Sequence, residues 1–291
     1  MCFYMPELPE VEVVKIFLED KLLNQTITNL EILNKKSFIG DTKDVINQKI
    51  IKFSRIGKQL SIYLSNGKIL LIHLKMTGQL ILGNTMLGHP TKFDKYPNKS
   101  TRLIIKFSPS CQRGGQGEIY FNDQRKFGWV QVFSANALSR FQSNLGLDIL
   151  DPKFTPDYLY NQLQRSSRPV KSVLLDQHFF AGIGNIYAND ALFLSKIHPT
   201  TPSNKINRTT ALKLHRALLS IMKQSILAGG STMKDNKYIR PDGSSGNNQF
   251  FFRVYQRAGE PCLICKTKIL RTVIAGRGTF FCPKCQLACN K

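Results

Sequence analysis

The sequence of 291 residues is poor in acidic side chains, lacks long apolar runs and contains no internal repeat. No stretch approaches the roughly 18 consecutive apolar residues of a membrane-spanning helix, so a membrane partner is not expected. No basic segment followed by an apolar core opens the chain, which argues against a secretory signal peptide. We therefore expect an intracellular protein, and its length is sufficient for two domains.

The shortage of acidic residues gives the chain a large positive charge. Nineteen Asp and Glu stand against 41 Lys and Arg, a formal net charge of +22 at pH 7. Such a surplus favours a polyanionic partner, because each Lys or Arg that contacts a phosphate releases counterions from it. On charge alone, an acidic lipid surface and a basic protein without any polyanionic partner are the alternatives.

Seven cysteines in an intracellular chain are not expected to form a disulfide framework, and four of them have metal-ligand spacing. Cys262 and Cys265 form one CxxC pair, and Cys282 and Cys285 form another. Two such turns place four thiolates around one ion, the shell that structural zinc prefers, whereas chance spacing is the weaker alternative. Four protein ligands leave no open position for water, so we predict one structural Zn²⁺. Three other cysteines have no assigned role: Cys2, Cys111 and Cys289.

The first half of the chain has the pattern of a helix followed by strands. Apolar residues recur at helical spacing over residues 10–23, which predicts a short amphipathic helix. A hairpin signal at residues 65–67 lies among the predicted strands, which cover residues 59–64, 68–74, 102–107, 118–121 and 129–133. We interpret this half as a β-sandwich.

The second half has helical patterns. Pro152 and Pro156 indicate a linker, and the helices predicted after it cover residues 159–163, 170–175, 186–194 and 210–227. Residues 231–248 are rich in glycine and asparagine and are expected to form a mobile loop before the zinc hairpin. The predicted fold class is therefore α+β.

Glycines separate two of the predicted helices in the segment Ala181-Gly182-Ile183-Gly184-Asn185. Glycines in a tight turn let the backbone approach a ligand closely, and the next helix presents its N-terminal amides to a phosphate. Asn185 is a candidate either to cap that helix or to bind the phosphate itself. A purely structural turn explains the two glycines equally well.

The segment PELPEVE, residues 6–12, places a proline directly after Met5 and two carboxylates, Glu7 and Glu10, three residues apart. Removal of the methionine would leave Pro6 as a terminal secondary amine. An α-amino group with a pKa of roughly 7.7–8.0 is partly unprotonated at cellular pH and can act as a nucleophile, with Glu7 moving protons. Prolines that merely begin a helix are the structural alternative.

Taken together, these segments resemble the bacterial formamidopyrimidine-DNA glycosylases and the broader family of helix-two-turn-helix base-excision enzymes. The resemblance covers essentially the whole chain and is carried, in order, by PELPEVE, RIGKQL, HLKMTG, DQRKFG, GIGNIYANDALF, GGSTMKD, VYQRAGEPC and GRGTFFCPKCQ. It implies a catalytic β-sandwich over residues 6–150, a helix-two-turn-helix DNA-binding domain with a lesion-capping loop over 151–250, and a zinc finger over 251–291. We expect a cytoplasmic, nucleoid-associated monomer.

The resemblance also implies an activity and catalytic residues. The enzyme would be a bifunctional glycosylase and AP lyase that acts on double-stranded DNA containing oxidised bases. Pro6 would attack the sugar C1′ atom and form a Schiff base, and strand cleavage would follow by β,δ-elimination. Glu7 would be the acid/base and Glu10 would support the site. Lys58 and Arg277 match residues that contact phosphates at the lesion and belong to the same catalytic set.

Other matched positions are expected to bind DNA. Enzymes that act on a stacked base must extrude it and fill the gap, and Met76, Arg125 and Phe127 match the family's wedge. The remaining DNA-binding candidates, which match phosphate or lesion contacts, are His73, Lys126, Lys171 and Asn185. For Met76 and Phe127, ordinary core packing is the alternative. The segment 231–248 matches the loop that closes over an oxidised purine, which favours 8-oxoguanine and formamidopyrimidines as substrates.

The chain departs from the family pattern at several positions. Residues 1–4 precede Met5, and a retained extension would make Pro6 an amide, so we expect translation to start at Met5. Asp190, a supporting residue, stands where the family usually has glutamate; Lys126 replaces a common arginine, and residues 92–95 lack the histidines of many relatives. An oxidised-pyrimidine glycosylase of the same fold and a damage-binding protein without chemistry are the alternative functions.

Overall fold

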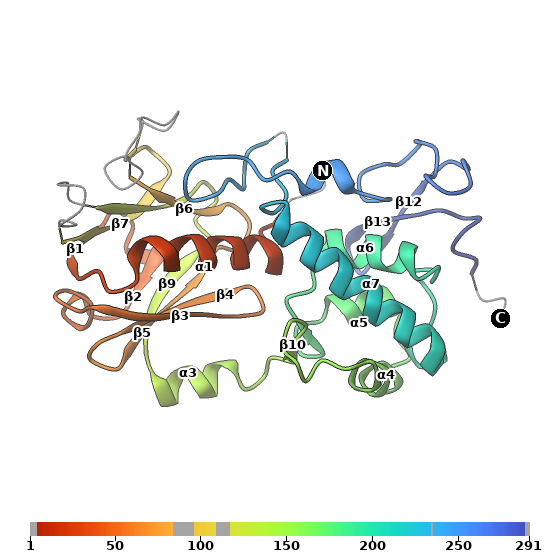
Figure 1. Cartoon of the computed structure of the whole chain (residues 1–291), viewed down its shortest axis with the longest axis horizontal. Helices are drawn as coiled ribbons and strands as arrows, with labels where there is room; N and C mark the ends of the chain where they lie inside the picture. The colour runs from red at the N-terminus through yellow and green to blue at the C-terminus, as the bar shows by residue number, and fades with distance from the viewer. Residues whose placement is uncertain (1–4, 84–95, 109–116, 234, 289–291) are drawn as a thin grey trace. The chain divides into compact units, whose positions relative to one another are not determined.

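The computed structural model describes residues 5–83, 96–108, 117–233 and 235–288, and these form two compact units. The sheet unit contains the described residues within 5–144 and 228–247, and the helical unit contains those within 145–227 and 248–288. The expectations for residues 1–4 and 92–95, and for Cys2, Cys111 and Cys289, lie outside the described residues. Figure 1 labels the elements of each unit.

The sheet unit begins with helix α1 (Leu8–Leu22), which packs against β3 (Ile50–Ile56) and β4 (Gln59–Leu64). The apolar side chains at helical spacing form its buried face: Val11, Val14, Leu18 and Leu22. The helix begins two residues before the predicted start, because Pro9 is compatible with a first turn and Glu10 caps the first residues.

Two sheets follow, which confirms the predicted α+β class. The five-stranded sheet has the order β2 (Phe38–Ile39), β9 (Trp129–Ser134), β5 (Lys68–His73), β4, β3. The four-stranded sheet has the order β1 (Ile27–Ile32), β7 (Thr101–Phe107), β8 (Glu118–Asp123), β6 (Gly78–Leu82). Short helical elements complete this unit: η1 (Lys35–Ser37), η2 (Thr42–Asp44) and α3 (Ala135–Gln142).

The chain crosses from one sheet to the other twice, and the two crossings are adjacent. One connection, residues 74–77, leads from β5 to β6, and the other, residues 124–128, leads from β8 to β9. His73 pairs with Trp129 in the five-stranded sheet, and Gly78 pairs with Asp123 in the four-stranded sheet. Both connections therefore begin and end on paired strands, and the segments HLKMTG and DQRKFG lie side by side.

Residues 231–248, which are predicted to form a mobile loop, lie largely in segment 228–247, whose described residues belong to the sheet unit. The segment packs on the four-stranded sheet, where the backbone N–H of Leu82 donates to the carbonyl of Pro241 (2.8 Å). Tyr238 is buried, and Ile239 joins a hydrophobic cluster that also contains Ile81, Ile104 and Tyr120. Tyr238 and Ile239 thus attach the described part of this segment to the sheet unit, and its mobility stays a prediction.

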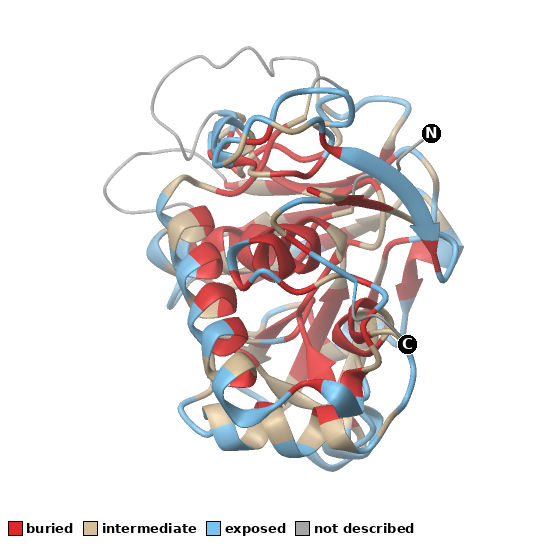
Figure 2. Ribbon diagram, turned by 90° about the vertical axis from the view of Figure 1, so that its right-hand side faces the viewer, coloured by how far each residue is buried: buried red, intermediate tan, exposed pale blue. Residues whose placement is uncertain are grey.

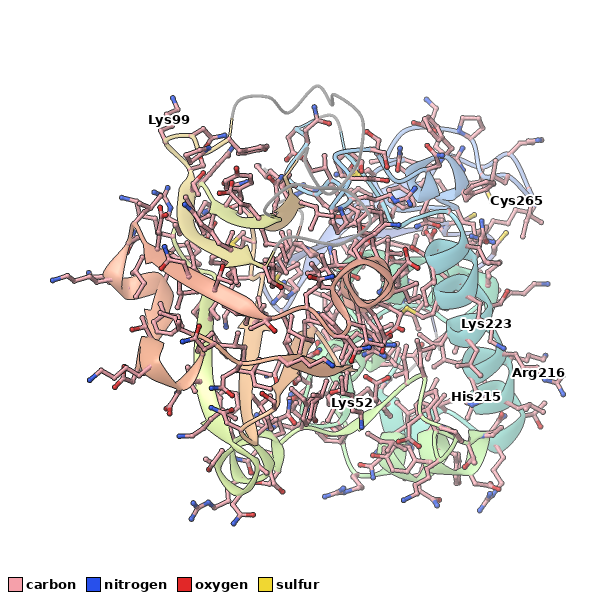
Figure 3. All side chains as sticks on the ribbon, turned by 60° about the vertical axis from the view of Figure 1, so that its left-hand side comes forward. Lys52, Lys99, His215, Arg216, Lys223 and Cys265 are labelled. Carbon is pink, nitrogen blue, oxygen red and sulfur yellow. The ribbon has the colours of Figure 1, made fainter. Side chains whose placement is uncertain are left out.

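The helical unit contains the predicted helices, and α5 has the predicted bounds. Its elements are β10 (Leu147–Asp148), α4 (Pro156–Gln164), α5 (Val170–Leu175), β11 (Phe180–Ala181), α6 (Asn185–Leu194), η3 (Ser203–Lys205), α7 (Arg208–Leu227), η4 (Asn248–Phe251), β12 (Leu270–Ile274) and β13 (Arg277–Phe281). Helix α7 packs against α4 and α6 along one face, and Figure 2 shows buried and exposed residues alternating along it. Arg216 and Lys223 project from its exposed face (Figure 3).

The last two strands form an antiparallel hairpin beside α6, where Val273 pairs with Gly278. Within the described ranges, no helix has an apolar stretch long enough to cross a membrane.

Candidate active site and zinc centre

The start of α1 holds the predicted catalytic carboxylates in a buried setting. Pro6 and Glu7 are buried, and the side chain of Glu10 is completely inaccessible to solvent. One oxygen of Glu10, Oε2, accepts the backbone N–H of Glu7 (2.9 Å), and the other, Oε1, accepts the backbone N–H of Ser231 (2.9 Å). The structure therefore gives Glu10 a supporting geometry, because it joins the start of α1 to the segment 228–247.

The base of that segment is closed by further contacts. Ser231 and Asn247 form an isolated bridge, and the backbone N–H of Gly246 donates to Oγ1 of Thr232 (2.8 Å). Gly230 has a φ of +79°, and a Cβ there would lie 2.9 Å from Cε1 of Tyr238 and 3.1 Å from Cγ of Glu10. Glycine is therefore required at position 230 by both conformation and space.

His73 and Lys58 lie on neighbouring strand ends. Lys58 immediately precedes β4, whose first residue, Gln59, pairs with His73 at the end of β5. Burial of the ring, together with the charges of Lys75 and Lys58, lowers the pKa of His73 to about 3. The imidazole is therefore neutral at physiological pH. Its Nδ1 accepts the backbone N–H of Lys75 (3.0 Å), so the ring proton is assigned to Nε2, which can donate to a phosphate oxygen.

The three predicted wedge residues come from the two connections between the sheets. Met76 is partly buried, whereas Phe127 is 51% exposed. The guanidinium carbon of Arg125 lies 5.0 Å from the centroid of the Phe127 ring, a cation–π contact. Lys126 between them is exposed and has a φ of +59°, which turns the chain sharply. The structure thus brings together residues that are some fifty positions apart in the sequence.

In the helical unit, the predicted glycine turn leads directly into α6, and Gly182 has a φ of +103°. Gly184 is the N-cap of this helix and Asn185 its first residue, so the interpretation of Asn185 as the cap is wrong. The Asn185 side chain instead donates through Nδ2 to the carbonyl of Gly278 (3.1 Å) in the zinc hairpin. Its predicted contact with phosphate stays a prediction.

Lys171 of α5 reaches the same carbonyl. Its side chain is completely buried, and Nζ donates to the Gly278 carbonyl (2.9 Å) and to Oγ1 of Thr279 (2.7 Å). Both acceptors follow Arg277, which is exposed at the start of β13. The ammonium of Lys171 is thus used inside the protein, next to Arg277, and its predicted DNA contact also stays a prediction.

Polar residues of α6 hold the rest of the hairpin. Oδ1 of Asn189 accepts the backbone N–H of Phe280 (2.8 Å). The carboxylate of Asp190 accepts three consecutive backbone N–H groups, from Arg253, Val254 and Tyr255, at 2.9–3.1 Å. Burial raises the pKa of Asp190, and these hydrogen bonds oppose the rise. Asp190 therefore supports the chain that leads into the zinc finger, although aspartate has a shorter reach than glutamate.

The four predicted cysteines lie close together, with their Sγ atoms all within 4.8 Å of one another. The shortest separations are 3.4 Å between Cys265 and Cys282 and 3.9 Å between Cys262 and Cys285. Zinc bonded to four sulfurs at about 2.3 Å requires sulfurs about 3.8 Å apart, so the cluster fits the ion. Figure 3 marks Cys265. The chain thus has a structural zinc site with no position left for water.

The zinc knuckles are attached to the helices by Gln286. Its Oε1 accepts the backbone N–H of Cys282 (2.9 Å), and its Nε2 donates to the carbonyl of Ile197 (2.8 Å). Backbone N–H groups of Ile264 and Cys285 donate to Sγ of Cys262 and Cys282 respectively, both at 3.4 Å. Such bonds orient the thiolates and stabilise their negative charge.

Three family models match the chain. The formamidopyrimidine-DNA glycosylase N-terminal domain matches residues 5–130, the formamidopyrimidine-DNA glycosylase H2TH domain residues 145–237, and a zinc finger found in FPG and IleRS residues 259–288. A formamidopyrimidine-DNA glycosylase of Chloroflexus aurantiacus is 37% identical over 288 residues, which cover 97% of this chain and 98% of the relative. The chain belongs to the formamidopyrimidine-DNA glycosylase family. A second family member, from Pelotomaculum thermopropionicum, is 36% identical over 97% of this chain and 99% of its own length.

Solved structures of the glycosylase family have the same fold. The MutM (Fpg) protein of Thermus thermophilus has a TM-score of 0.84 at 34% identity, covering 97% of this chain and 98% of that chain. Lactococcus lactis Fpg in complex with DNA containing an abasic site has a TM-score of 0.85 at 30% identity, covering 97% of this chain and 100% of that chain. The resemblance inferred from the sequence segments is therefore confirmed.

Sequence reasoning did not identify several polar residues that position the glycosylase site. Asn189 and Thr279 fasten the zinc hairpin, while Asp123 and Thr77 fasten the two connections between the sheets. Asn189 lies four residues after Asn185, so helical spacing alone could have placed both on one face. The partners of the others are distant in sequence and give no local signal.

Proposed function

We propose that the chain is a bifunctional DNA glycosylase and AP lyase that excises oxidised purines, 8-oxoguanine and formamidopyrimidines, through Pro6. The observation that carries this proposal is the buried group at the start of α1, where Glu10 holds both the Glu7 backbone and Ser231 beside Pro6. Family membership supports a glycosylase. A solved Lactococcus lactis relative binds DNA containing Fapy-dG, which supports an oxidised purine as substrate.

In this mechanism the amine of Pro6, free once Met5 is removed, attacks the C1′ atom of the damaged nucleotide. The glycosidic bond breaks, and the leaving base takes the bonding electrons and a proton. Glu7 supplies a proton where the sugar ring opens, and the resulting iminium is the Schiff base. Loss of a C2′ proton then expels the 3′ phosphate, a second elimination expels the 5′ phosphate, and water releases Pro6.

Substrate binding is assigned to basic, polar and wedge side chains. Neutral His73 donates through Nε2, and Lys58 and Arg277 contribute charge to phosphates, while Asn185 and Lys126 are further phosphate contacts. The net charge of +22 supports such an interface. Met76, Arg125 and Phe127 would fill the gap left by the extruded nucleotide. We retain the three domains, 6–150, 151–250 and 251–291, as functional divisions, and propose a monomer that acts on duplex DNA in the nucleoid.

Borohydride trapping tests the chemistry. Protein whose terminus is verified as Pro6 should form a covalent adduct with an 8-oxoguanine duplex, because borohydride reduces the Schiff base to a stable amine. The matched control is the same chain with residues 1–5 retained, which has an amide at Pro6 and should give no adduct. Absence of an adduct with the verified Pro6 terminus would leave only binding of damaged DNA without chemistry.

Substrate preference is tested separately with matched duplexes. Single-turnover excision should be faster for 8-oxoguanine than for thymine glycol. The opposite order would assign the chain to oxidised pyrimidines while leaving the role of Pro6 intact.

A further inference from the structure

Asp123 is the last residue of β8, and its completely buried carboxylate joins the two connections between the sheets. Oδ1 accepts the hydroxyl of Thr77 and the backbone N–H of Arg125 (3.1 Å). Oδ2 accepts the backbone N–H of Gly128 (2.6 Å). Oγ1 of Thr77 in turn accepts the backbone N–H of Arg125 (3.0 Å), so one carboxylate and one hydroxyl organise both connections.

These donors lie at or next to each wedge residue. Thr77 follows Met76, Gly128 follows Phe127, and the third donor is the backbone of Arg125 itself. An ionised carboxylate accepts on both oxygens and donates nothing, so it can satisfy all three donors at once. Outside the wedge, the Asp123 carbonyl is held by Nε of Arg102 (2.8 Å).

The connection 124–128 needs this support because its own conformation is strained and tightly packed. Lys126 has a φ of +59°, a backbone conformation that residues other than glycine rarely adopt. A Cβ at Gly128 would lie 2.8 Å from Cζ of Phe121 and 3.2 Å from Oδ2 of Asp123, so the chain passes directly over the carboxylate. The Phe127 side chain, by contrast, is half exposed.

We propose that Asp123 is a positioning residue that, with Thr77, fixes Met76, Arg125 and Phe127 in the geometry needed to enter a DNA duplex. This inference rests on the wedge role assigned in the proposed function. Asp123 does not touch DNA or the Pro6 site in this role. It acts through the backbone of the two connections. The wedge residues therefore have their inserting conformation before DNA binds, and no free energy is needed to order them.

The variant Asp123→Asn tests the role with almost no change in shape. An asparagine amide has one acceptor and one donor end, so either Gly128 or the Thr77–Arg125 pair must face an N–H group. An unsatisfied buried donor is costly, so we expect a loss of wedge insertion by about 10- to 100-fold, equivalent to about 1.4–2.8 kcal/mol. Thr77→Val should give a smaller loss in the same direction, and Thr77→Ser, which keeps the hydroxyl, should behave as wild type.

Wedge insertion is measured by the fluorescence of 2-aminopurine placed beside a tetrahydrofuran abasic analogue in a duplex. Wild type should unstack the probe and raise its fluorescence, and Asp123→Asn should need correspondingly more protein for the same rise. Borohydride trapping on single-stranded abasic DNA, which has no stack to open, should be unchanged in the variant. Excision of 8-oxoguanine from a duplex should fall with the fluorescence response.

A double variant that combines Asp123→Asn with Phe127→Ala tests whether Asp123 acts through the wedge. If Asp123 acts through the wedge, the double variant should be little worse than Phe127→Ala alone. Equal fluorescence responses for wild type and Asp123→Asn would overturn the proposal, as would an equal loss of single-stranded trapping, which would indicate general damage to the fold. If Asp123→Asn does not fold, Thr77→Val takes its place in the same measurements. Failure of wild-type trapping would reject the Pro6 chemistry, while the fluorescence comparison would still decide the role of Asp123.

Discussion

Replacing Lys171 by methionine separates two roles that a buried lysine beside Arg277 can have. If Lys171 contacts DNA directly at the lesion, as the family resemblance implies, the variant removes a charge from the interface. If Lys171 instead positions the zinc hairpin, as its hydrogen bonds to Gly278 and Thr279 indicate, the variant loosens the strand that presents Arg277. Methionine is unbranched and of similar length, so it fills the same space without an ammonium.

The expected effect on stability is small. Two hydrogen bonds from a charged donor contribute about 1.5–3 kcal/mol each, while burial of the ammonium costs several kcal/mol. The two contributions nearly cancel. Both acceptors also keep another partner, because Asn185 donates to the Gly278 carbonyl and the Thr279 hydroxyl donates to the carbonyl of Arg277. We expect the free energy of unfolding of Lys171→Met to fall by only about 1–2 kcal/mol.

The expected effect on DNA binding is larger and has a diagnostic salt dependence. Fluorescence anisotropy with a duplex containing a tetrahydrofuran abasic site should show an affinity about tenfold lower, a loss of about 1.4 kcal/mol. Each phosphate contact that is removed reduces the slope of log K against log salt concentration by about 0.9. A buried positioning residue makes no phosphate contact of its own, so in the Arg277→Ala background the slope should not change further when Lys171→Met is added. Arg277→Ala is the matched control, because loss of an exposed phosphate contact should reduce the slope.

A further reduction of the slope by about 0.9 when Lys171→Met is added to Arg277→Ala would refute the positioning role and favour a direct phosphate contact of Lys171. A coupling measurement gives an independent check. Lys171 and Asn185 donate to the same carbonyl, so Lys171→Met combined with Asn185→Ala should destabilise the protein by more than the two single changes together, by about 1 kcal/mol. Strict additivity would argue that the shared carbonyl of Gly278 does not matter.

Three further predictions follow from the same structure. Verified removal of zinc should abolish DNA binding while the strand signal in circular dichroism persists; unchanged binding would contradict the role of the finger. His73 has a folded pKa of about 3 against an unfolded value of 6.5, so its stabilising contribution is complete above pH 6.5 and is lost as the pH falls towards 3. The difference in unfolding free energy between wild type and His73→Gln should shrink accordingly between pH 7 and pH 4 in urea titrations, and a constant difference would contradict the lowered pKa. Gly230→Ala should destabilise the sheet unit by more than Gly67→Ala in urea unfolding, because both glycines have a φ of +79° but only Gly230 has atoms within 4 Å of an added Cβ; equal losses would leave only backbone strain.

The sequence allowed the elements and the zinc site to be predicted because their signals are local. The segment 170–175 is a helix with the bounds that its apolar spacing predicts, and the CxxC pairs place four thiolates around one position. The pairing of the two connections between the sheets could not be predicted in the same way. It depends on β5 joining β9 and β6 joining β8, and strand order is not a local property.

The segment 228–247 illustrates a different limit. Composition predicts a mobile loop over residues 231–248, and it gives no sign that the described residues of 228–247 pack on the four-stranded sheet and donate to Glu10. Glu10 and Ser231 are 221 residues apart, and no spacing rule connects them. The prediction of the α6 cap was wrong for a simpler reason. Glycine and asparagine are both favoured at the N-cap of a helix, so only the observed backbone distinguishes Gly184 from Asn185.

Three buried carboxylates order the backbone around proposed site residues. Glu10, Asp123 and Asp190 each accept backbone N–H groups of a separate segment, and each segment carries or adjoins proposed site residues. Charge-assisted hydrogen bonds from backbone N–H groups stabilise a buried carboxylate. Only 19 acidic residues stand against 41 basic ones, and these three order the backbone at segments that are distant in sequence. The few buried acidic residues of so basic a chain therefore have a structural use that composition alone does not reveal.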